Sequence, residues 1–205
     1  MSIVKLNNNG IKNVTTLGSV TLGNMVLIKK LTASSSSTLS FVNGTSDVVL
    51  DSTYKEYVFT FNNIHPSNDN ASFEFQCSTD GGSNYNTTIT STCFIAYNYE
   101  SGGTPGLGYY AARDQAQGTS FQHFMRDIGN GNDESSSGTL TLYNPASTTF
   151  VKHFTADCSL YYSGDAEFDY KYAGYFNTTS AINAIQFKCS AGTVDSGDIC
   201  LYGIT

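Results

Sequence analysis

The feature that most constrains the fold is a two-residue repeat of apolar side chains in short segments. Tyr57, Phe59 and Phe61 occupy alternate positions of the segment 56–62, and the segment 72–77 alternates between apolar and polar residues in the same way. Successive side chains of a β-strand point to opposite faces, so this spacing predicts strands with one buried face. An amphipathic helix would instead need apolar residues three or four positions apart.

Strand-like segments separated by turn residues continue to the end of the chain. After Gly138 they cover residues 139–143, 150–160, 167–175, 184–189 and 198–204. Aromatic residues make up 13% of the chain and charged residues another 13%, a composition that suits half-buried strands with a neutral polar surface. With about ten strands and no internal repeat, we predict an all-β fold, an antiparallel two-sheet β-sandwich of jelly-roll type.

Two local predictions concern the connections between strands. Asp80-Gly-Gly-Ser is a turn signal that predicts a hairpin, with residues 85–90 returning as the partner of the strand 72–77. Residues 100–138 form the least regular stretch, and 111–128 is the only part of the chain where we expect a short helix.

The chain is predicted to consist of an arm and one domain. Residues 1–24 are rich in Asn, Gly and Thr and contain too few large side chains to fold alone, whereas residues 25–205 suffice for one β-domain. The predicted partner-binding residues are the apolar residues of the arm: Ile3, Val4, Leu6, Ile11, Val14 and Leu17. No run approaches the roughly 20 apolar residues that cross a bilayer, and the first six residues lack the order of a secretion signal, so we expect a soluble chain without membrane insertion.

The net charge limits the class of binding partner, and the cysteine spacing indicates the redox state of the compartment in which the chain folds. The formal net charge is -7 with only ten Lys and Arg residues, which argues against a nucleic-acid partner. The five cysteines cannot all pair within one chain, and Cys77, Cys158 and Cys189 lie in phase with apolar neighbours at period two. We interpret these three as buried free thiols, which indicates assembly in a reducing cytoplasm.

No group of residues points to catalysis or to a cofactor. The three histidines lack metal-ligand spacing, and no nucleophile elbow occurs, so we predict a protein without enzymatic activity or cofactor. Glu167 and Asp169 share a strand face about 7 Å apart, as paired glycosidase carboxylates could, but a solvated face with Lys171 as counter-charge is the favoured interpretation.

Two weaker candidate sites lie in the irregular stretch. The oxygen ligands of Asn130, Asn132, Asp133 and Glu134 could hold a calcium ion, although a plain exposed loop is favoured because the spacing is not that of a dedicated calcium loop. The candidate residues for contact with a receptor, either a glycan or a protein, are Tyr99, Tyr109, Tyr110 and Phe121.

Several segments resemble one family when taken together. Leu31-Thr-Ala-Ser-Ser-Ser-Ser-Thr-Leu-Ser-Phe, Phe75-Gln-Cys-Ser-Thr-Asp-Gly-Gly-Ser-Asn-Tyr and Gly138-Thr-Leu-Thr-Leu-Tyr-Asn-Pro-Ala-Ser are similar to segments of small tail-fibre-like or virion structural proteins of marine tailed bacteriophages, of the cyanophage or pelagiphage type. The resemblance covers most of residues 25–205 and brings no catalytic residue with it. It implies a structural role on the virion, after assembly in the host bacterial cytoplasm.

The resemblance leaves several roles open. The leading expectation is a tail fibre or a tail-associated adhesion or adaptor module, which contacts other phage structural proteins and forms a homotrimer. The alternative is a capsid decoration protein that stabilises the head shell. A glycan-binding or glycan-degrading receptor protein is the third hypothesis.

Overall fold

The computed structural model describes residues 16–17, 20–21 and 24–205 and contains fifteen β-strands and no helix in these residues. All strand pairs are antiparallel, so the predicted all-β antiparallel fold is confirmed. No helix in the described part has the length and apolarity needed to cross a bilayer. The strands are β1 (Thr16–Leu17), β2 (Val20–Thr21), β3 (Met25–Thr32), β4 (Leu39–Val42), β5 (Glu56–Pro66), β6 (Ala71–Ser78), β7 (Ile89–Tyr99), β8 (Gly106–Tyr109), β9 (Ala116–Gly118), β10 (Gln122–Ile128), β11 (Ser136–Tyr143), β12 (Lys152–Tyr162), β13 (Ala166–Phe176), β14 (Ala184–Cys189) and β15 (Val194–Ile204).

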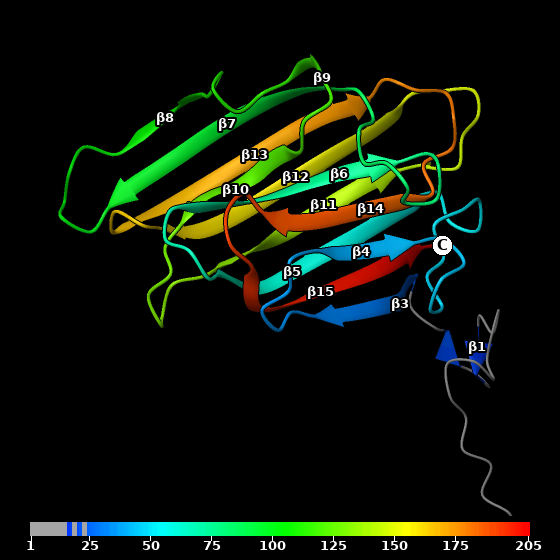
Figure 1. Cartoon of the computed structure of the whole chain (residues 1–205), viewed down its shortest axis with the longest axis horizontal. Helices are drawn as coiled ribbons and strands as arrows, with labels where there is room; N and C mark the ends of the chain where they lie inside the picture. Colours follow the sequence, from blue (N-terminus) through cyan, green and yellow to red (C-terminus); the bar gives the residue numbers. More distant parts are fainter. Residues whose placement is uncertain (1–15, 18–19, 22–23) are drawn as a thin grey trace, which may run out of the picture.

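Thirteen strands belong to one sheet that folds back over itself and nearly closes into a barrel (Figure 1). The strand order is β3-β15-β5-β11-β12-β10-β6-β14-β4, and β13, β7, β8 and β9 continue from β12. Strands β10 and β12 share a single residue pair, Ile128 with Tyr162. We call β10, β6, β14 and β4 the small half-sheet and the remaining strands of this sheet the large half-sheet.

The core lies between the two half-sheets and is built mainly from phenylalanine rings. Phe187 of β14 lies 5.4 Å from Phe59 and 5.2 Å from Phe61 of β5, measured between ring centroids. Phe75 of β6 lies 5.3 Å from Phe154 of β12 in an edge-to-face contact. The predicted burial of Phe59 and Phe61 is confirmed, because inward residues at period two meet the opposite half-sheet.

The cysteines follow the same pattern. Cys77, Cys158 and Cys189 are free and buried, as predicted, and Cys93 is buried as well, whereas Cys200 is partly exposed. Burial raises the pKa of Cys77 and Cys158 well above its ordinary value and raises the pKa of Cys189 to about 12. These thiols are therefore protonated and unreactive at neutral pH.

The prediction of a short helix over 111–128 is wrong. This stretch contains β9 and β10, and β10 pairs with β6 through two register shifts. The shifts disturb the alternation, so that Phe124 and Met125 are both buried although they are adjacent. Packing across the sheet therefore decided the structure of a segment whose local pattern was ambiguous.

The predicted hairpin after the strand 72–77 is also wrong. The neighbours of β6 are β10 and β14, and β7 begins only at Ile89 and pairs with β13. The turn residues are present but close a local loop: the Asp80 carboxylate accepts hydrogen bonds from the Ser78 hydroxyl and from the backbone and side-chain amides of Asn84, which lower the pKa of Asp80 to about 2. From this loop the chain passes from the small to the large half-sheet.

The predicted arm lies mostly outside the described residues. Of its candidate contact residues, Ile3, Val4, Leu6, Ile11 and Val14 lie outside them, and Leu17 pairs with Val20 in the two-stranded β1–β2 sheet. The strand β3 begins at Met25, next to the predicted boundary. The division into an arm and a domain stays a prediction.

Candidate binding groove on the outer face

A row of rings crosses the outer face of the large half-sheet. His153 of β12 is in register with Tyr175 of β13, and their ring centroids lie 6.0 Å apart. Tyr143 follows Leu142, which pairs with Phe154, so Tyr143 lies beside His153 at the end of β11. These side chains point outward because the intervening residues of each strand fill the core.

A second row, made of short side chains, runs alongside the rings. Thr141 of β11, Thr155 of β12, Ala173 of β13 and Thr92 of β7 are in register across four neighbouring strands. None of them is fully buried, and the Tyr143 hydroxyl lies 3.3 Å from the Thr155 hydroxyl. Short side chains beside large rings leave a trough that runs across the strands.

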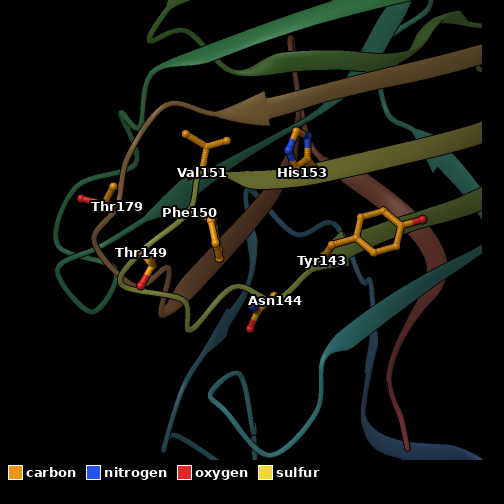
Figure 2. A pocket seen from close by; sticks show the side chains of 7 residues that line it. All are labelled: Tyr143, Asn144, Thr149, Phe150, Val151, His153 and Thr179. Carbon is orange, nitrogen blue, oxygen red and sulfur yellow. The ribbon is translucent and has the colours of Figure 1, made fainter.

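Two adjoining hollows coincide with these rows and share His153. The first, of about 540 Å³, is shown in Figure 2, where its lining comes from the end of β11, the loop before β12, the start of β12 and the loop after β13. The second, of about 300 Å³, lies over the trough between β12, β13 and β7. We call the two together the cross-strand groove. It is lined by Tyr143, Asn144, Thr149, Phe150, Val151, His153 and Thr179 in the first part and by Thr90, Ser91, Thr92, Phe154, Thr155, Ala173, Gly174 and Tyr175 in the second.

Phe150 is a strongly exposed ring of the groove, with 69% of its surface accessible. Its loop is held in place, because the Ser147 hydroxyl accepts hydrogen bonds from the backbone N–H groups of Thr149 and Phe150. The loop begins at Asn144, whose N–H donates to the backbone carbonyl of Lys55 and whose φ is +44°. A large apolar side chain is thus presented to solvent on a fixed support.

The charged side chains in the row next to the groove are paired with each other. No Asp, Glu, Lys or Arg lines the groove. In the next row Lys171 bonds to Asp157 and lies 3.8 Å from Asp169, and the bond to Asp157 raises the pKa of Lys171. The carboxylate of Glu167 accepts a hydrogen bond from Ser159 on the same outer face. The expected solvated face with Lys171 as counter-charge is confirmed.

The predicted receptor-contact residues pack against different partners. The ring of Tyr99 lies edge-on to Tyr97 and Phe168, the Arg126 guanidinium lies 5.2 Å from the Tyr110 ring, and Lys188 lies 4.3 Å from the Phe121 ring. Tyr109 is about half exposed, forms an edge contact with Phe94 and donates its hydroxyl to Asp114. A receptor contact at these residues stays a prediction.

The candidate calcium residues form a loop with internal contacts. The Glu134 carboxylate accepts a hydrogen bond from the Gly131 N–H, and the Asn130 side chain donates to the backbone carbonyl of Ser67. Asn132 and Asp133 are exposed. Within the described residues no three His, Cys, Asp or Glu side chains come together in a way that could hold a metal ion. Calcium binding stays a prediction.

One charged cluster was not anticipated. Glu74 on the outward face of β6 is nearly buried, and its carboxylate lies 3.2 Å from both His123 of β10 and Lys188 of β14. Burial lowers the pKa of His123, although Glu74 opposes this effect. The carboxylate is thus saturated by two neighbours within the small half-sheet, which is the arrangement of a structural ion pair.

The groove could have been recognised only in part from the sequence. His153 and Thr155 lie two positions apart in the expected strand 150–160, which places them on one strand face, and both are exposed on the outer face of β12. The registers that bring Tyr143 and Tyr175 to the same row depend on strand pairing, which the sequence pattern does not reveal.

Comparisons with protein-family models, curated proteins and solved structures found no match.

Proposed function

We propose that this chain is a non-enzymatic structural protein on the surface of a tailed-phage particle, and that it serves as a tail fibre or a tail-associated adhesion module. The observation that carries the proposal is the exposed apolar edge formed by β3, the strand that follows the predicted arm. Met25, Val26 and Leu27 are all exposed there, and within the described part of the sheet β3 pairs only with β15. An apolar edge strand with free backbone groups is suited to strand addition by a neighbouring subunit.

We also propose that the architecture is a two-sheet β-sandwich of jelly-roll type, with the small and large half-sheets as its two layers. Two features support this: the single residue pair between β10 and β12, and the aromatic core between the halves. A layered domain of this kind would leave the outer face of the large half-sheet free for contacts.

In this proposal the partners are other phage structural proteins and two further copies of the chain in a homotrimer. Assembly takes place in the host bacterial cytoplasm before the particle is released. The five free cysteines, four of them buried, support folding in a reducing compartment.

The first test removes the arm. Deletion of residues 1–24 should abolish incorporation of the protein into particles, because the arm and the adjoining edge form the docking surface. Circular dichroism of the purified variant should still show a folded β-domain. Normal incorporation of the truncated chain would contradict the proposal.

A matched pair of substitutions tests the edge itself. Leu27→Lys on β3 should reduce incorporation, because a charge would have to be buried against the neighbouring subunit. The control is Leu107→Lys on β8, where the leucine is 82% exposed on another edge strand and should tolerate the charge. Equal incorporation of the two variants would argue against docking through β3.

A capsid decoration protein is the alternative that uses the same docking surface. Counting copies per particle separates the two roles, because a tail position predicts at most tens of copies and a head position predicts hundreds. A glycan-degrading activity is the least favoured role, and a reducing-sugar assay on host polysaccharide is expected to show none.

A further inference from the structure

We propose that the cross-strand groove binds a neutral oligosaccharide. The inference rests on the proposed function for its biological meaning, since it names the ligand of the adhesion role. The binding itself is a property of the isolated chain and can be measured without particles.

The rings of the groove match the apolar face of sugar rings. Tyr143, His153 and Tyr175 stand on three neighbouring strands, and strands lie about 4.8 Å apart, so the row extends over about 10 Å. This length is comparable with two linked sugar rings. Phe150 adds an exposed apolar ring in the loop before β12, where a sugar could pack without displacing another side chain.

The remaining lining matches the hydroxyl groups of a sugar. Threonine hydroxyls can donate and accept hydrogen bonds, and the side chain of Asn144 can do both as well. The groove contains Thr149 and Thr179 near Phe150, Thr92 and Thr155 along the trough, and Thr90 in register with Tyr175. The small side chain of Ala173 leaves depth between the ring row and the row that contains Asp157 and Lys171. Concave sites with rings and a few polar groups are the usual form of small-ligand sites.

The absence of Lys and Arg from the groove lining favours a neutral sugar over anionic ligands. A ligand carrying carboxylate or sulfate groups would find no Lys or Arg in the groove lining. Lys171 beside the groove is bonded to Asp157, and the buried Lys152 donates its ammonium group to the backbone carbonyl of Thr178. An ionic group buried without a partner is costly, and the net charge of -7 adds repulsion toward anions. The same argument disfavours nucleic acid and charged peptides.

The test is a glycan array that carries neutral and acidic oligosaccharides and is probed with the full-length chain. Calorimetric titration of the best neutral ligand follows. Phe150→Ala and Tyr175→Ala are each expected to weaken binding about tenfold, because each removes a stacking ring. Tyr109→Ala separates the groove from the predicted receptor-contact residues. This ring is 53% exposed on β8 of the same half-sheet but does not line the groove, so binding in the groove should stay within about twofold, whereas a contact at Tyr109 would lose affinity.

The outcomes separate this inference from the proposed function. Loss of binding in Tyr109→Ala but not in Phe150→Ala would place the site elsewhere and overturn the inference. Binding of acidic glycans alone, or of no glycan at millimolar concentration, would also overturn it. None of these results bears on docking through the arm, which the truncation decides. Particles carrying Phe150→Ala that assemble normally but adsorb poorly to host cells would support both.

Discussion

The buried thiols are the side chains for which folding changes the protonation equilibrium most clearly. Cys77 and Cys158 are buried, and burial raises their pKa well above the 9.0 of an unfolded chain. The pKa of Cys189 is raised to about 12 by the same cause. In each case the folded protein retains a proton that the unfolded chain would release.

This difference predicts a loss of stability in alkaline solution. A group whose folded pKa lies above its unfolded value contributes stability that is complete below the unfolded value and is lost as pH rises toward the folded one. The free energy of unfolding should therefore fall between pH 9 and about 12, by up to ~1.4 kcal/mol per pH unit for each thiol. Urea unfolding at pH 8, 9 and 10.5 measures this slope.

Cys189→Ala is the control for this prediction. The substitution leaves a small cavity that lowers stability at every pH, but it removes one titrating group, so the slope above pH 9 should become shallower. A slope identical to that of the parent chain would show that Cys189 does not contribute.

Single-residue burial was predictable where it followed from alternation. Phe59, Phe61 and Cys77 occupy inward positions of clean period-two segments, and all three are buried. Glu74 was not predictable, because it alternates with buried neighbours as an outward residue does. It is buried because His123 and Lys188 of the neighbouring strands close over it, and sequence periodicity contains no information about what covers an outer face.

At the scale of the strand, β11 approaches β12 unusually closely at Gly138. A Cβ atom added there would lie 2.4 Å from the backbone oxygen of Asp157 and 2.9 Å from the Cα of Cys158. Both obstacles are backbone atoms of the paired strand, so they cannot move without disturbing the ladder. The glycine is required by this close approach.

Gly138→Ala is therefore expected to destabilise the protein by about 1–3 kcal/mol, measured by urea unfolding at neutral pH. The matched control is Gly108→Ala on β8, another glycine within a strand, around which no atom lies within 4 Å of an added Cβ. Its effect should stay within about 0.5 kcal/mol. Equal effects of the two substitutions would show that the contact with β12 is not the cause.

Strands were predictable from sequence where alternation was regular and turns were explicit. The expected segments 139–143, 167–175 and 184–189 correspond closely to β11, β13 and β14. The strands β9 and β10 were missed because register shifts in β10 break the two-residue period. The pairing partners of the strands were even harder to predict from the sequence. The loop after β6 has the residues of a hairpin turn but leads to the other half-sheet.

At the scale of the whole molecule, the last strand of the sequence, β15, joins the edge strand β3 to the rest of the large half-sheet. β15 lies between β3 and β5, and its residues pair with both. Most strand pairs join segments far apart in the sequence, as in the pairing of β14 with β4. Such a chain gains little stability from any part alone.

We therefore expect one cooperative unfolding transition and slow refolding, on the order of milliseconds to seconds or longer. Far-ultraviolet circular dichroism and tyrosine fluorescence should report the same midpoint in urea. Deletion of residues 194–205 removes β15 and should leave the chain without a protease-resistant core. A stable fragment after this deletion would contradict the expected cooperativity.

The strict alternation along β12 has a consequence for how such a protein can diversify. From Lys152 to Leu160 every second residue faces the core, and the residues between them face solvent. Mutations at His153 or Thr155 therefore change the outer face of the sheet without altering the interior that keeps the protein folded. Substitutions can thus accumulate at one set of positions while the other set keeps the core intact.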